Sequence, residues 1–154
     1  GPLLEHVLER LASVSGSTRS EFLTALQKSH CVSADNAHAV HPNYTDRHEL
    51  NNAPYVNEGV VVKNNVSQRY ATSPSSVVPI VHAAVTAGVN LQTFSSRNNI
   101  ACGSTIGPIT ATRLGIETVD IGVPQLSMHS IREMCGTKDP VDLVALLGAY
   151  FSRS

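Results

Sequence analysis

Residues 60–94 read VVVKNNVSQRYATSPSSVVPIVHAAVTAGVNLQTF, and this stretch decides the expected fold. It opens with three β-branched residues, Val60–Val62, and closes with a short apolar segment, Leu91–Phe94, both typical of strands. Between them the apolar spacing predicts a helix from Pro74 to Val85, which Gly88 should end. A strand, a helix and a second strand in this order indicate an α/β unit.

Elements of the same two kinds are expected on both sides of this stretch. Upstream we predict helices over 3–11 and 21–27 and a strand over 31–34; downstream, a helix over 108–114 closed by Gly115 and a strand over 117–121. A final helix should begin at Asp139-Pro140. Helices that alternate with short apolar strands predict one α/β domain, layered around a mostly parallel sheet.

Three local details of these helices can be predicted. Pro79 is unfavourable inside a helix, so that helix should begin only near Ser76. Ser130 and Glu133 have the spacing of a capping box, which predicts a further helix from this point. In the last helix we expect a buried stripe made of Leu143, Val144, Leu147, Tyr150 and Phe151.

The composition excludes several classes of function. The 154 residues are 42% hydrophobic and 15% charged, with a net charge of −1, so no basic field suggests nucleic-acid binding. Because no apolar run reaches membrane-spanning length and no signal peptide is recognisable, a soluble cytoplasmic protein is the default expectation. Cys31, Cys102 and Cys135 lack CxxC spacing, which argues against a disulfide framework and a zinc knuckle.

The strongest chemical signal is the segment DNAHAVHPNY, residues 35–44. Asp35 stands where an apolar strand ends, and ligands of open α/β sheets bind just beyond the carboxyl ends of strands. A carboxylate followed by His38 and His41 therefore predicts a metal and substrate site. The alternative is a polar loop in which both imidazoles bond the backbone. The polar segment continues to Asn57, and long irregular loops in compact domains are often functional.

A second candidate ligand lies beyond another strand. His129, in the segment MHSIRE, follows the apolar run Val119–Gly122. Two strand-end loops would then each offer one metal ligand, unless His129 merely precedes a helix cap. Lys63 directly follows the valine strand, and Tyr70 lies seven residues later. These two side chains could bind an anionic substrate group and a developing oxyanion, or be a solvated lysine and a packed tyrosine.

A glycine-rich turn, CGSTIGP at residues 102–108, enters the helix predicted at 108–114. Its exposed backbone N–H groups could bind an anion, although close packing of a helix on a strand explains the glycines equally well. The turn is neither a P-loop nor a dinucleotide fingerprint. The chain also lacks HExxH, GxSxG and any Glu-Glu pair, so a catalytic base is not evident.

Four long motifs resemble those of one enzyme family. They are SADNAHAVHPNYTDRHE, the segment from Lys63 to QRYATS, CGSTIGPITA and VDIGVPQLSMHSIRE, and they follow one another along nearly the whole chain. In these motifs the chain resembles the M18, or aspartyl aminopeptidase, family. The resemblance implies the carboxyl-terminal half of a three-layer αβα zinc-exopeptidase catalytic domain.

The resemblance also implies an activity and a set of site residues. Family members remove N-terminal residues, typically Asp or Glu, from peptides with two zinc ions, which cobalt or manganese could replace. By position, Asp35 resembles a ligand of one zinc and His129 a ligand of the other. Substrate-binding residues are matched by His38, Lys63 and Tyr70. His41 resembles a histidine that completes a neighbouring subunit's active site, in homo-oligomers that are commonly dodecamers.

The chain differs from the family pattern because parts of the family's catalytic domain are not found in its sequence. Residues 1–154 match the carboxyl-terminal part of the catalytic domain, so the amino-terminal half and an inserted β-rich domain are expected to be absent. That half supplies a His ligand, a bridging Asp and a Glu-Glu pair in the family. Asn52 stands where some relatives carry a further histidine. The expected function is therefore part of a zinc aminopeptidase or, alternatively, an inactive structural and oligomerisation fragment of one.

Overall fold

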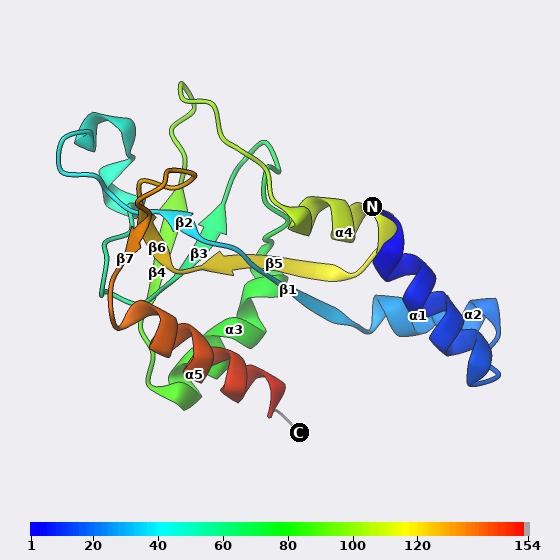
Figure 1. The fold of residues 1–154 in the computed structure, drawn as a ribbon. Coiled ribbons are helices and arrows are strands. Elements are labelled where there is room, and N and C mark those ends of the chain that lie inside the picture. Colours follow the sequence, from blue (N-terminus) through cyan, green and yellow to red (C-terminus); the bar gives the residue numbers. More distant parts are fainter. Residues whose placement is uncertain (153–154) are drawn as a thin grey trace.

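The structure is a computed structural model that describes residues 1–152. A four-stranded sheet forms the centre of the molecule (Figure 1). Its strands, in spatial order, are β1 (His30–Ala34), β5 (Glu117–Gly122), β3 (Val60–Asn64) and β4 (Leu91–Ser95). The pairs β1–β5 and β3–β4 are parallel, whereas β3 runs antiparallel to β5. The prediction of a mostly parallel sheet in an α/β fold is thus confirmed.

A smaller sheet continues from the end of the first. It consists of β2 (Ala37–His38), β6 (Pro124–Leu126) and β7 (Met134–Cys135), with β6 in the middle. Because β1 runs into β2 and β5 runs into β6, two neighbouring parallel strands leave the main sheet at the same end and pair again. The segments that follow Asp35 and Gly122 are held side by side by this second pairing.

Helices cover both faces of the main sheet (Figure 1). The helices are α1 (Leu3–Val14), α2 (Arg19–Gln27), α3 (Pro74–Ala87), α4 (Ile106–Leu114) and α5 (Asp139–Phe151). Side chains of a strand alternate between faces, so Val60 and Val62 pack with Ile80 and Leu146 of α3 and α5. Val61 faces the other side, where it packs with Tyr70 and other residues.

The ends of α3 and α4 follow the predicted signals, with one correction. Gly88 and Gly115 end these helices in the left-handed conformation, at φ 65° and 67°. The expectation that α3 begins near Ser76 is wrong: it begins at Pro74, because Ser73 and Ser76 form a capping box. With its amino end fixed in this way, the helix continues through Pro79.

The helix predicted after Ser130 does not form. Residues 127–133 make turns, and Ser127 and His129 adopt left-handed backbone angles there. The two side chains of the supposed box bond turn amides instead: Glu133 accepts from the His129 N–H and Ser130 accepts from the Arg132 N–H. The chain then enters β7, whose pairing with β6 takes the place of the helix.

The last helix also differs in two details. Asp139 is its first residue rather than its cap, and the carboxylate turns back to accept hydrogen bonds from the N–H groups of Asn57 and Gly136. The predicted stripe is partly wrong, since Val144 and Phe151 are 70% and 75% exposed. Leu146, outside that stripe, is fully buried in the core.

Two shorter features complete the fold. The polar segment after β2 carries two short 3-10 helices, Thr45–Arg47 and Leu50–Asn52. At the opposite end, α2 and α4 share a second small core of Phe22, Leu26, Leu114 and Ile116. Among the helices of residues 1–152, none combines the length and the apolar character that crossing a bilayer needs.

Candidate active site

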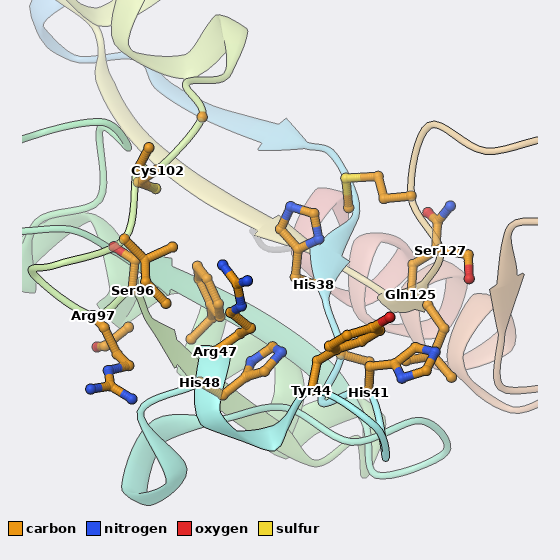
Figure 2. A pocket seen from close by; sticks show the side chains of 18 of the residues that line it. His38, His41, Tyr44, Arg47, His48, Ser96, Arg97, Cys102, Gln125 and Ser127 are labelled. Atoms are coloured by element: carbon orange, nitrogen blue, oxygen red, sulfur yellow. The ribbon is translucent and has the colours of Figure 1, made fainter.

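A cavity of about 500 Å³ opens where the segments beyond the two sheets meet. Four parts of the chain line it: residues 38–48, Tyr70, residues 94–103 and residues 125–128. In Figure 2 the side chain of His38 lies between Cys102 on one side and Gln125 and Ser127 on the other. A space of this size, with convergent polar groups, suits a small ligand or the end of a peptide.

Asp35 directly follows β1 and is not among the described residues that line this cavity. Its N–H donates to the Ile121 carbonyl over 2.9 Å, which continues the pairing of β1 with β5. The main chain at Asp35 passes very close to Gly122. A Cβ atom at position 122 would lie only 1.7 Å from the Asp35 carbonyl oxygen. Glycine at position 122 is therefore required for the path that the main chain of Asp35 takes.

Lys63 forms hydrogen bonds with the main chain of Asp35 and Asn36. Its Nζ donates to the Asp35 carbonyl over 2.9 Å and to the Asn36 carbonyl over 3.4 Å, and lies 3.8 Å from Asp35 Oδ2. Burial lowers the pKa of Lys63, while the charges of Asp35 and Asp120 act in the opposite direction. Only 1% of Lys63 is exposed, and it is not among the described residues that line the cavity. The side chain predicted to bind substrate thus fixes Asp35.

Tyr70 does reach the cavity. Its ring lies 5.2 Å from Lys63 Nζ and packs edge-on against Phe94, with 6.2 Å between ring centres. Its hydroxyl accepts a hydrogen bond from the Cys102 thiol over 3.5 Å. Burial, with a smaller effect of Cys102, raises the pKa of Tyr70 well above its usual value. The hydroxyl therefore keeps its proton at physiological pH and can donate it to a ligand oxygen.

His38 lies in the cavity wall. Although its side chain is open to the cavity, the atoms crowded around the ring lower the pKa of His38. Positive charge on His129 and on Lys63 lowers it further, and Asp35 raises it. Asp35 and His129 are therefore both near enough to His38 to act on its charge, although neither lines the cavity itself. At neutral pH the lowered pKa favours the uncharged imidazole.

His129 and His41 occupy different parts of the site. His129 lies in the exposed turn between β6 and β7, with a left-handed φ of 65°. His41 lines the cavity, accepts a hydrogen bond from the Asn43 N–H through Nδ1 and lies 5.1 Å from the Tyr44 ring. Figure 2 shows His41 and Tyr44 together on one flank of the cavity, away from Cys102.

Three basic residues of the cavity escaped the sequence analysis. Arg47 and His48 belong to the long polar segment, whose length was a general signal of function, but nothing singled them out. The pKa of His48 is lowered by burial and by the charge of His38. Arg97 donates to the Asp46 carbonyl and so ties the segment after β4 to the same loop. No local pattern marks Arg97, because its role comes from a long-range contact.

The two side chains predicted to bind zinc are of the right chemical kind, but within the described residues they do not make a complete site. A carboxylate from Asp35 and an imidazole from His129 are ordinary zinc ligands, and a catalytic zinc site uses three protein ligands. Within residues 1–152 no group of three His, Cys, Asp or Glu side chains is arranged to hold a metal ion. A complete zinc site would need ligands from elsewhere.

A family model described as Aminopeptidase I zinc metalloprotease (M18) matches residues 1–151. The chain belongs to the M18 family. The "Probable M18 family aminopeptidase 2" of Pseudomonas fluorescens (strain SBW25) is 49% identical over 152 residues, which are 99% of this chain and 34% of that protein. That of Stutzerimonas stutzeri (strain A1501) is 49% identical over 154 residues, or 100% of this chain and 35% of that protein. The M18 chain thus spans about a third of the length of these relatives.

Solved structures agree with this assignment. A cryo-EM structure of the Ape4 and Nbr1 complex superposes with a TM-score of 0.92 at 44% identity, covering 98% of the M18 chain and 29% of the other. The crystal structure of prApe1 gives 0.92 at 33% identity, covering 99% and 32%. A structure of the S. cerevisiae mApe1 dodecamer gives 0.83 at 32% identity, covering 99% and 33%. The fold expected from the motifs is therefore that of this family.

Proposed function

We propose that this chain is the part of a zinc aminopeptidase that carries the substrate side of the active site. The complete enzyme removes N-terminal residues, with a preference for Asp and Glu, from peptides. One observation carries the proposal: His38, His41 and Tyr70, all expected from the motifs, line one cavity beside Asp35. Family membership over nearly the whole chain supports the same activity.

In this proposal each residue has a separate task. Asp35 binds one zinc ion and His129 the other, and residues from the rest of the protein complete both coordination spheres. When bound, the two ions would act as Lewis acids toward a water molecule and toward the peptide carbonyl of the substrate. His38 and Tyr70 hydrogen-bond the substrate, and Lys63 favours acidic residues through its charge behind Tyr70. Cobalt or manganese could replace zinc.

We also propose that the enzyme is a homo-oligomer in which His41 contacts a neighbouring subunit. His41 lies on the flank of the cavity, beside Tyr44, which is 57% exposed. An M18 relative of similar fold is solved as a dodecamer, and this supports an assembly of that size. A cytoplasmic location remains a prediction from composition.

The test uses the complete protein that contains this chain. Asp35→Asn and His129→Gln should each lower the bound zinc, measured by mass spectrometry of the metal, and lower kcat for Asp- and Glu-aminoacyl substrates by at least about a hundredfold. The matched control is Asp46→Asn, since Asp46 is an exposed carboxylate on the cavity loop. Asp35 and His129 variants that keep full zinc content and turnover would refute their assignment as ligands.

The second candidate is an inactive structural and oligomerisation fragment of such an enzyme. It is favoured by the lack of a three-ligand group within residues 1–152. A mass spectrum of the intact natural protein separates the two. A companion polypeptide or a longer chain supports the enzyme, whereas a sole species of 16.4 kDa supports the fragment.

A further inference from the structure

Asp120 is a fully buried carboxylate in the middle of β5, and the roles proposed above do not use it. One carboxylate oxygen accepts a hydrogen bond from the Ala71 N–H over 2.7 Å. The other accepts one from the Thr105 hydroxyl over 2.6 Å. The Asp120 N–H in turn donates to the Thr72 hydroxyl over 3.0 Å. One residue of the sheet thus holds two loops.

The start of α4 rests directly on this carboxylate. A Cβ atom on Gly107 would lie 2.4 and 2.5 Å from the two Asp120 carboxylate oxygens. Glycine at position 107 therefore lets the first turn of α4 approach the strand. The sequence left open that the glycine-rich turn binds an anion from solution. In the structure this turn packs against the carboxylate of Asp120.

Both loops held by Asp120 lead into the cavity. Ala71 directly follows Tyr70, and Thr105 comes three residues after Cys102; Tyr70 and Cys102 line the cavity and bond each other. A shift at Asp120 would therefore reach this wall through two independent connections. The charge of Asp120 also acts on Lys63 and on Tyr70.

We propose that Asp120 is a positioning residue that sets the cavity wall made of Tyr70 and Cys102. It acts through the Ala71 amide and the Thr105 hydroxyl, and does not itself contact substrate. Its consequence for catalysis rests on the proposed aminopeptidase function. The effect of Asp120 on the geometry of the cavity wall is independent of that proposed function.

The chain offers a matched control in Asp139, a second fully buried aspartate. Asp139 also accepts two hydrogen bonds, from the N–H groups of Asn57 and Gly136. Neither of those partners lines the cavity. An Asp→Asn change at position 120 or 139 therefore removes a charge of similar burial, but only the first should disturb Tyr70 and Cys102.

The experiment compares Asp120→Asn with Asp139→Asn in the complete protein. The first readout is the alkylation rate of Cys102, followed by mass spectrometry of the tryptic peptide 98–113, in which Cys102 is the sole cysteine. In Asp120→Asn this rate should rise about tenfold, because the loop loses its anchor, and in Asp139→Asn it should stay unchanged. The second readout is KM for an Asp-aminoacyl substrate, which should rise about tenfold in Asp120→Asn alone, at unchanged zinc content.

Thr105→Val is a milder variant in case Asp120→Asn does not fold. It removes one of the two side-chain hydrogen bonds that hold the loops and should raise the Cys102 rate by a smaller factor, about threefold. An unchanged Cys102 rate in both variants, or equal changes in Asp120→Asn and Asp139→Asn, would overturn the proposal. A wild-type protein that hydrolyses no aminoacyl substrate would refute the proposed function, and the Cys102 rates would still test Asp120.

Discussion

The sequence predicts that Lys63 binds substrate, and the structure shows contacts of this side chain that no local pattern indicated. A lysine at a strand end suggests a solvated cation that meets an anionic substrate. The structure buries it against two carbonyl oxygens, of Asp35 and Asn36. Removing a cation from water is costly unless other groups compensate. Here Asp35 and Asp120 provide this compensation, and both come close to Lys63 through long-range strand pairing.

We predict that Lys63→Met in the complete protein lowers zinc affinity as well as substrate affinity. Methionine keeps the apolar stem but removes the group that holds the Asp35 carbonyl. Partners that orient a metal ligand are typically worth about 10- to 100-fold in metal affinity or activity, and a loss in this range is expected. The measurements are zinc content against a competing chelator and KM for an Asp-aminoacyl substrate.

Lys28→Met is the control for this prediction, because Lys28 is exposed at the end of α2. It should leave zinc affinity and KM unchanged. If Lys63→Met raised KM alone and left zinc affinity intact, Lys63 would act on the substrate and not through Asp35.

At the scale of elements, the contact between β1 and the two helices below it is polar as well as apolar. His30 Nε2 lies 2.9 Å from the Ser76 carbonyl of α3, which can only accept a hydrogen bond, so this nitrogen carries a proton. Nδ1 lies 2.7 Å from the Tyr150 hydroxyl of α5, and this hydroxyl also donates to the His30 carbonyl oxygen over 3.4 Å. One imidazole thus connects a strand with both helices of this face.

Tyr150→Phe is predicted to reduce the free energy of unfolding by about 1–2 kcal/mol, because it removes the hydroxyl that bonds the part-buried His30 ring nitrogen and carbonyl oxygen. The ring and its packing in the core remain. Denaturant unfolding of the complete protein measures the change, and aminopeptidase activity at low denaturant should be retained. Tyr55→Phe, at a half-exposed tyrosine outside the core, serves as the matched control and should change stability by less than about 0.5 kcal/mol. Equal effects of the two substitutions would contradict the role of the His30 bond.

The sequence predicted elements well where local signals decide them. Gly88 and Gly115 end their helices as expected, and the strands over Val60–Val62 and Leu91–Phe94 form. It failed where tertiary pairing overrides a local motif. Residues 130–133 have the residues of a capping box, but pairing of β7 with β6 keeps them in turns.

The same limit applies to the site. Residues in recognisable motifs, such as His38, His41 and Tyr70, line the cavity as a group. Arg97 and Asp120 could not be assigned a role, because each acts on a segment about 50 residues away in the chain. Their partners become neighbours only when the sheet and its loops assemble.

At the scale of the whole molecule, apolar surface is distributed unevenly. No residue of α1, over Leu3–Val14, is buried, although Leu8 and Ala12 pack partly on the core beside α2. Leu3, Leu11 and Val14 are more than half exposed. Large exposed apolar patches on soluble proteins usually mark contact surfaces. The M18 relatives, about three times as long, have further chain with which such a surface could be covered.

This leads to the last prediction: the 154-residue chain, purified alone, will not hydrolyse Asp- or Glu-peptides and will bind zinc weakly. Asp35 and His129 leave most of a zinc coordination sphere to water, whereas catalytic sites use three protein ligands held by further hydrogen bonds. No Glu-Glu pair is present in the sequence to take the proton of an attacking water. The exposed apolar side chains of α1 should also make the isolated chain self-associate. Aminopeptidase assays with added zinc, together with light scattering, measure these properties, and turnover comparable to that of a full-length M18 enzyme would show that the catalytic residues have been misplaced.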